Sequence, residues 1–215
     1  MTDNLSSTIP KNRAKPQPKA RKLGNFVESR VSNLQARYLN GDNSARAQLA
    51  NLRASIVQPL GADRTSWQIV FNDFPPELMG NTDQPNRFEL AAQLALSLFA
   101  LHCQSANGPI HVSGIGFGLA VRRLAEARGN TDHDSPTMRR FHELGTANSF
   151  SALQYRARGL IQLMRAEKIE LDYGVFAKDL CDFLVPEYQN NVRLRWARDY
   201  YRVPKTTPET TNEQK

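Results

Sequence analysis

The sequence predicts an all-α fold, a helical bundle of roughly eight helices. Apolar residues recur every three or four positions along most of the 215-residue chain, which places them on one face of each helix. Almost no segment alternates with a period of two, and residues 110–112 are the only strand-like stretch. Capping residues, prolines and glycines separate the apolar runs, so the approximate helix boundaries can be predicted as well.

Two helices and one short helix are predicted in the N-terminal third of the chain. Apolar residues at helical spacing run over residues 26–38, and Asp42 or Ser44 can cap a second helix over residues 45–56. Prolines and glycines then interrupt the chain repeatedly and leave room only for a short helix at residues 67–71. This part of the chain is therefore the one long irregular region that the sequence predicts.

The next predicted helix is the central one. Residues 87–104 are apolar nearly all round, which is typical of a helix buried on most faces rather than of an amphipathic surface helix. A glycine-rich connection over residues 108–118 leads into a helix over residues 119–127, which Gly129 closes. We therefore expect the other helices to surround residues 87–104.

Four further helices follow, and each begins at a recognisable N-terminal signal. A Ser-Pro pair at residues 135–136, Ser149 or Ser151, and Asp172 can each provide an N-cap, and Pro186 opens the last helix. These helices are expected over residues 136–144, 149–164, 172–183 and 186–200.

The composition divides the chain into three parts. Residues 1–22 are polar, contain prolines and carry six basic residues against one acid, so we expect a disordered basic arm. Residues 23–202 form the helical domain, because 40% of the whole chain is hydrophobic, which is enough for a packed core. Residues 203–215 are polar with no net charge and are expected to be a disordered tail.

The sequence predicts a cytoplasmic protein without membrane contact. The most apolar stretch, residues 90–101, is shorter than the roughly 20 apolar residues that span a bilayer. No apolar run follows the basic N-terminus, so no secretory signal is expected. Cys103 and Cys181 lie far apart and outside any C-x-x-C motif, which argues against a disulfide framework or a cysteine zinc site.

The basic residues of the helical domain are almost all arginine. Residues 23–202 contain 18 Arg but only Lys168 and Lys178, opposed by 18 acidic residues. The guanidinium group presents a flat fork of donors that suits phosphate oxygens and also stacks on bases. This bias indicates a polyanion as partner, although a GC-rich genome would produce the same composition.

No motif of the chain predicts catalysis, a cofactor or a metal. Gly114, Gly116 and Gly118 precede a helix, but the spacing is G-x-G-x-G, no βαβ unit surrounds it and no Lys-Ser/Thr pair follows. We therefore interpret this segment as a turn that packs tightly against a neighbouring helix. The four histidines, His102, His111, His133 and His142, form no pair at the spacing of metal ligands.

The arginines can be sorted by whether a nearby acid already pairs with them. Carboxylates four residues further on can neutralise three of them: Glu126 for Arg122, Glu143 for Arg139 and Asp199 for Arg195. Arg140 shares Glu143 with Arg139, so this acid cannot neutralise both. Arginines without an acid four residues before or after them include Arg53, Arg123, Arg156, Arg158, Arg165 and Arg198. Taken together, unpaired arginines on several helices indicate a surface that follows a phosphate backbone.

Several short segments follow one another in an order that can be compared with known families. They are AQLANLR at 47–53, Trp67, LFALH at 98–102, GLAVRRLA at 118–125, RRFHEL at 139–144, LIQLMR at 160–165, LDY at 171–173 with Asp179 and Leu180, and RWARDYY at 195–201. Their order and spacing resemble the CasB family, the small subunit of the type I-E CRISPR complex Cascade. The resemblance covers roughly residues 26–202 and excludes the basic arm.

The resemblance implies an all-helical, non-enzymatic subunit that forms a head-to-tail homodimer within Cascade and contacts the other Cascade subunits. Its basic surface is expected to bind the crRNA and the single-stranded DNA that is displaced when the guide pairs with its target. One departure is that Leu119 follows Gly118, where the family pattern has a basic residue. The residues expected to contact nucleic acid are Arg53, Arg122, Arg123, Arg139, Arg140, Arg156, Arg158 and Arg198.

Two other classes of function can be distinguished from this one. A helix-turn-helix regulator of duplex DNA would concentrate its base-reading side chains on one recognition helix, whereas the arginines here are spread over several helices. An enzyme would need an acid-base, metal or phosphate-loop constellation, and the sequence indicates none.

Overall fold

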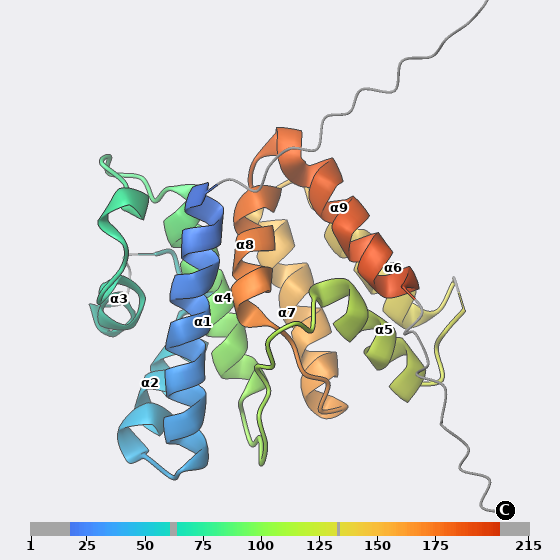
Figure 1. The fold of residues 1–215 in the computed structure, drawn as a ribbon, viewed down its shortest axis with the longest axis horizontal. Helices are drawn as coiled ribbons and strands as arrows, with labels where there is room; N and C mark the ends of the chain where they lie inside the picture. Colours follow the sequence, from blue (N-terminus) through green and yellow to red (C-terminus); the bar gives the residue numbers. More distant parts are fainter. Residues whose placement is uncertain (1–17, 61–63, 133, 203–215) are drawn as a thin grey trace, which may run out of the picture.

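The computed structural model describes residues 18–60, 64–132 and 134–202, and in these ranges the chain forms nine α-helices, two 3-10 helices and no strand (Figure 1). The expected all-α class is confirmed. Most of the expected arm, all of the expected tail and His133 lie outside the described residues. The helices are α1 (Pro18–Leu39), α2 (Asn43–Ala54), α3 (Arg64–Phe71), α4 (Arg87–His102), α5 (Phe117–Ala127), α6 (Pro136–Gly145), α7 (Phe150–Ala166), α8 (Tyr173–Phe183) and α9 (Pro186–Tyr201), with η1 (Ser55–Val57) and η2 (Pro76–Leu78) as the 3-10 helices.

Helix α1 begins at Pro18, two turns before the predicted start at residue 26. Ala20 and Leu23 are fully buried and continue the apolar face of Val27 towards the N-terminus. Proline is tolerated in the first turn of a helix, where its missing N–H has no intrahelical partner. The last five residues of the expected disordered arm are therefore helical, and the expected boundary after residue 22 is wrong.

Helix α4 lies at the centre of the bundle, as predicted. It packs against α1, α2, α7 and α8, and nearly all of its side chains are buried. Its N-terminus is a capping box that the sequence analysis missed: the Asn86 side chain accepts from the N–H of Glu89 at 3.0 Å, and the Glu89 carboxylate accepts from the N–H of Asn86 at 2.8 Å.

The predicted N-caps are in place. Asp42, rather than Ser44, caps α2, because its carboxylate accepts from the N–H of Ser44 at 2.7 Å. Three further side chains each accept from a backbone N–H in the first turn of a helix. These caps are Ser135 for α6, Ser149 for α7 and Asp172 for α8.

Glycines allow two pairs of helices to approach closely. Helices α1 and α8 lie side by side (Figure 1), and a Cβ on Gly24 would lie 2.9 Å from the carbonyl oxygen of Gly174. Helix α5 packs against α9 in the same way, since a Cβ on Gly118 would lie 2.0 Å from the carbonyl oxygen of Trp196. The glycine-rich segment before α5 is thus a tight packing turn, as the sequence predicts.

The only strand-like stretch pairs through a single bridge. His111 forms an isolated parallel bridge with Leu171, which joins the connection before α5 to the turn between α7 and α8. Gln35 of α1 holds this connection, since its side-chain oxygen accepts from the N–H groups of Ile110 and His111, each at 2.7 Å. The irregular backbone between α4 and α5 is therefore fixed by hydrogen bonds from two other parts of the fold.

Both cysteines are buried, unbonded thiols. Burial raises the pKa of Cys103 and of Cys181 to about 12, which leaves them protonated and unreactive at neutral pH. In the part of the chain that the structure describes, no helix is both long and apolar enough to cross a membrane.

Candidate nucleic-acid interface

Three of the expected site residues meet at one hollow between α6 and α7. Arg140 comes from α6, and Arg156 and Arg158 come from α7. The hollow measures about 350 Å³, and the lining residues are Arg140, Glu143, Tyr155, Arg156, Arg158, Gly159 and Gln162. A concave surface with three guanidinium groups is suited to a phosphate-bearing ligand.

The sequence of α7 explains why Tyr155, Arg158 and Gln162 point outward together. Tyr155, Arg158, Gln162 and Arg165 are spaced by three or four residues, so they lie along one face of the helix. The opposite face is apolar and buried in the core, with Leu153, Ala157, Leu160, Ile161 and Met164. Burial of that face fixes the rotation of α7 and presents the polar face to solvent.

No carboxylate of the described residues pairs with an arginine of the hollow. Arg158 forms no hydrogen bond or ion pair with any described residue, and Arg140 donates only to the carbonyl oxygen of Pro136 at 3.5 Å. Arg156 donates to the carbonyl of Glu143 and, at 3.4 Å, to the hydroxyl of Thr146. The three arginines thus outnumber Glu143, the one acidic residue among those that line the hollow, and Glu143 forms an ion pair with none of them.

Two further arginines without a carboxylate partner among the described residues lie near the C-terminal end of α4. Arg165 at the end of α7 donates to the side chain of Gln104, and Arg53 of α2 donates to the carbonyl oxygen of Ala100 at 3.3 Å. Both side chains thus lie at the last turn of α4. We call Arg53, Arg165, Arg158, Arg156 and Arg140 the arginine strip.

Arg139 and Arg198 are exposed but do not line the hollow. The expected ion pair between Arg139 and Glu143 is not formed, and neither Arg139 nor Arg198 has a hydrogen-bond or ion-pair partner among the described residues. Arg139 adjoins Arg140 on α6, whereas Arg198 lies on α9, which packs against α5 and α8. Arg139 therefore adjoins a member of the arginine strip, whereas Arg198 lies on α9, which contributes no residue to the strip.

The two expected site residues on α5 are already paired. Arg122 pairs with Glu126 at 2.8 Å, as the sequence predicts, and also donates to the carbonyl oxygen of Arg202. Glu126, three residues after Arg123, pairs with Arg122 instead, and Glu170 from the turn after α7 reaches Arg123 at 3.1 Å. Tertiary contacts thus neutralise an arginine that the local sequence leaves unpaired.

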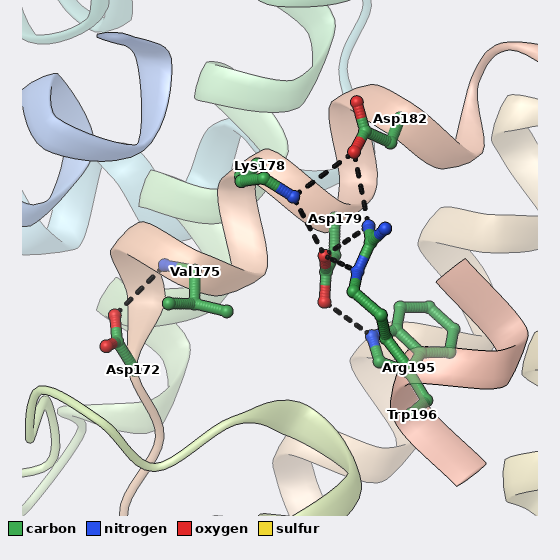
Figure 2. Close-up of polar contacts among 7 residues, drawn as sticks. All are labelled: Asp172, Val175, Lys178, Asp179, Asp182, Arg195 and Trp196. Carbon is green, nitrogen blue, oxygen red and sulfur yellow. Dashed lines mark hydrogen bonds and ion pairs between the residues drawn. The ribbon is translucent and has the colours of Figure 1, made fainter. Parts of the chain in front are cut away.

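Arg195 is partly exposed but is held by two buried carboxylates (Figure 2). It pairs with Asp179 at 2.7 Å and with Asp182 at 3.1 Å, so the expected pairing with Asp199 is wrong. The indole N–H of Trp196 donates to the other oxygen of Asp179 at 2.8 Å, and Lys178 lies 3.2 Å from Asp182. Burial raises the pKa of the Asp179 carboxyl, and the two cations and the indole N–H oppose this shift.

The histidines of the core take no part in the site. His102 is fully buried, with Nδ1 3.0 Å from the hydroxyl of Tyr173, and burial lowers its pKa to about 3. Among the described residues, no three His, Cys, Asp or Glu side chains lie close enough together to hold a metal ion. The chemistry that this surface supports is binding of a polyanion.

Tyr155, Gly159 and Gln162 line the hollow but were not among the expected site residues. One sequence signal for Tyr155 exists, since a large aromatic residue stands on the polar face of a helix whose apolar face is complete without it. For Gly159 and Gln162 the sequence contains no such signal.

Comparisons with known proteins agree with this architecture. The family model for the CRISPR-associated protein Cse2 matches residues 48–201. The crystal structure of CasB from Thermobifida fusca is similar at 32% sequence identity and a TM-score of 0.69, over 84% of this chain and 98% of that chain. The crystal structure of M. ruber CasB is similar in fold at 22% identity and a TM-score of 0.56, over 80% of this chain and 92% of that chain. Among curated proteins, none matches the sequence.

Proposed function

The chain belongs to the Cse2/CasB family and is thereby a CRISPR-associated Cascade subunit, and we propose that its arginine strip holds single-stranded nucleic acid within that complex. The observation that carries this proposal is the convergence of Arg140, Arg156 and Arg158 on one hollow without a carboxylate partner among the described residues. An unpaired guanidinium group gains most from a phosphate, because binding releases the counterions of the nucleic acid.

The subunit acts by binding and does not catalyse a reaction. When the guide RNA pairs with its target, the RNA–DNA duplex is about as stable as the DNA duplex that it replaces. Protein contacts to the displaced strand can therefore decide whether the R-loop persists. The arginine strip supplies such contacts to the displaced DNA strand, and the same chemistry serves for the crRNA. Arg53 at α2 and Arg140 at α6 mark the two ends of the path.

The subunit assembles as a head-to-tail pair within Cascade, which would place two arginine strips in succession along the nucleic acid. Native mass spectrometry of the purified complex measures the copy number. Two copies per complex would support this arrangement, and one copy would contradict it.

The test is charge reversal inside the hollow. We expect Arg140→Glu with Arg158→Glu to weaken the retention of target DNA by reconstituted Cascade about tenfold or more, since two phosphate contacts become repulsive. The matched control is Arg21→Glu with Arg64→Glu, which has the same net charge but lies on α1 and α3, whose packing partners are α2, α4 and α8. Competition with unlabelled DNA measures retention.

A normal R-loop lifetime in the hollow variant, with the complex fully assembled, would refute the proposed site. The wild-type subunit should also bind single strands with little sequence preference, and log Kd should vary with log salt by about 0.7 per phosphate neutralised. Footprinting that reveals one preferred duplex sequence would instead indicate a regulator of the helix-turn-helix type.

A further inference from the structure

We propose that Tyr155 is a stacking platform for one nucleobase and that Gly159 keeps the space beside it clear. This inference rests on the proposed function, because it assigns a base-binding role to the hollow that the arginines surround. The ligand class is a base of single-stranded nucleic acid, from DNA or from RNA, and the recognition is by the flat face of the base rather than by its edge.

The first observation is the exposure of Tyr155. Its relative accessibility is 80%, the highest among the large hydrophobic residues of the described chain. Within the described part of the chain it forms no hydrogen bond, ring contact or cation–π contact. A tyrosine ring that contributes nothing to the core has both faces available to a ligand.

The second observation is the glycine one turn along the same face. Gly159 lies in the interior of α7, where glycine destabilises a helix relative to alanine. A Cβ at this position would meet no atom within 4 Å, so neither packing nor backbone strain requires glycine. Residues four apart on a helix are neighbours, and the missing side chain therefore leaves open space directly beside the ring of Tyr155.

The third observation is the chemistry of the rim. Arg140, Arg156 and Arg158 line the hollow together with the tyrosine, against one acidic residue, Glu143, and Gln162 lies one turn beyond Gly159. An apolar protein partner would favour apolar neighbours, as are found at the separate apolar hollow of about 280 Å³ between α6 and α9. Cationic side chains around a lone aromatic ring instead match a nucleotide, whose phosphate and base require these two kinds of contact.

The experiment measures binding of a fluorescent thymidine oligonucleotide to the full-length chain at low salt, beside an oligonucleotide of equal length whose bases are replaced by abasic sites. For the wild type we expect the abasic strand to bind about five- to tenfold more weakly, because stacking is lost while every phosphate remains. Tyr155→Ala should weaken binding of the intact strand by a similar factor and bind both strands alike. Tyr155→Phe should behave as the wild type.

Gly159→Leu supplies a second, independent readout. It should raise the thermal midpoint of unfolding, because leucine is a better helix former, yet weaken binding of the intact strand by about the same factor as Tyr155→Ala. A purely structural role for Gly159 would not move stability and affinity in opposite directions. A uridine RNA of the same length, measured in parallel, shows which of the two nucleic acids the platform prefers.

The outcomes separate this inference from the proposed function. Equal binding of intact and abasic strands by the wild type overturns the stacking platform, and if Arg140→Glu with Arg158→Glu still weakens binding, the arginine strip stands without it. Normal binding by that arginine variant refutes the strip, and discrimination against the abasic strand then supports the platform alone. No binding of the intact strand overturns both.

An effect of Tyr155→Ala on Cascade assembly, with unchanged oligonucleotide binding, would overturn the stacking platform and show that Tyr155 contacts a protein.

Discussion

Arg123 of α5 and Arg195 of α9 have surroundings opposite to those of Arg140 of α6 and Arg158 of α7. Arg123 and Arg195 each face a carboxylate from a distant part of the chain, at 3.1 and 2.7 Å. Arg140 and Arg158, by contrast, have no carboxylate partner among the described residues. The carboxylates that pair with Arg123, Arg128 and Arg195 all belong to residues 167–182, and none of the ion pairs of this segment includes Arg140 or Arg158.

This difference shows that one residue type can have two roles in one fold. The guanidinium group of Arg195 bridges two buried carboxylates and joins α9 to α8 (Figure 2). A buried charge requires such a partner, because its transfer from water is costly. A solvated arginine has no such requirement and can remain unpaired until a phosphate arrives. The first kind contributes to stability and the second to binding, and each of the following experiments tests that division.

The largest expected effect is the loss of Asp179. Asp179→Ala should lower the free energy of unfolding by about 3 kcal/mol, because Arg195 and the indole N–H of Trp196 both lose their main acceptor. Chemical denaturation measures this change. Asp179→Asn, which can still accept from the indole, should lose less. A change below about 1 kcal/mol in the alanine variant would show that the network is not structural.

An intermediate effect is expected from acid. The pKa of His102 is about 3 in the folded chain and about 6.5 when unfolded, so below pH 6.5 the unfolded state binds a proton that the folded state does not. Stability should therefore fall by up to about 1.4 kcal/mol per pH unit from pH 6.5 towards pH 3 and be independent of this group above pH 7. Urea unfolding between pH 7 and pH 5 measures the slope, and over this interval the loss due to His102 should be about 2 kcal/mol.

The matched variant for this measurement is His102→Asn, which should show the smaller slope of the remaining groups. Parallel slopes for the two proteins would contradict the assignment to His102. Binding of single-stranded nucleic acid should stay constant between pH 6.5 and pH 8, since arginine remains charged throughout this range. The core is thus expected to respond to pH while the arginine strip does not.

The smallest effects should separate a paired from an unpaired arginine. Arg158→Gln should weaken binding of a single strand several-fold and leave stability within about 0.5 kcal/mol. Arg123→Gln should change stability by about 0–1 kcal/mol, the range of exposed ion pairs, and change binding by less than about twofold. Salt titrations of both variants measure the contrast. Equal losses of affinity would place Arg123 in the nucleic-acid path as well.

Most helices could be predicted because their signals are local. The caps Asp42, Ser135, Ser149 and Asp172 bond to backbone N–H groups two or three residues away, and such contacts depend only on neighbouring residues. The start of α1 at Pro18 was missed because Ala20 and Leu23 are buried by packing against other helices, while the surrounding sequence is polar and basic. The polar and basic composition of residues 1–22 therefore led to a prediction of disorder, although the fold buries Ala20 and Leu23.

The candidate site was predictable in part. Arg156 and Arg158 were expected because no acid stands four residues from them, and Arg140 because it shares Glu143 with Arg139. The fold brings these three together. Arg123 passed the same test, but it is neutralised by Glu170, 47 residues further along the chain. Gly159 carries no signal in the sequence, because its relevance comes from open space above the helix.

The sequence by itself determined the helical class, the helix boundaries set by caps and prolines, and the excess of arginine over lysine, since each depends on composition or on residues within one or two turns. Only the tertiary structure decided which arginines are neutralised. Ion pairs such as Arg195 with Asp179 and Arg123 with Glu170 depend on how the helices pack, because a charge interacts with whatever lies within a few ångströms of it and not with its neighbours in sequence.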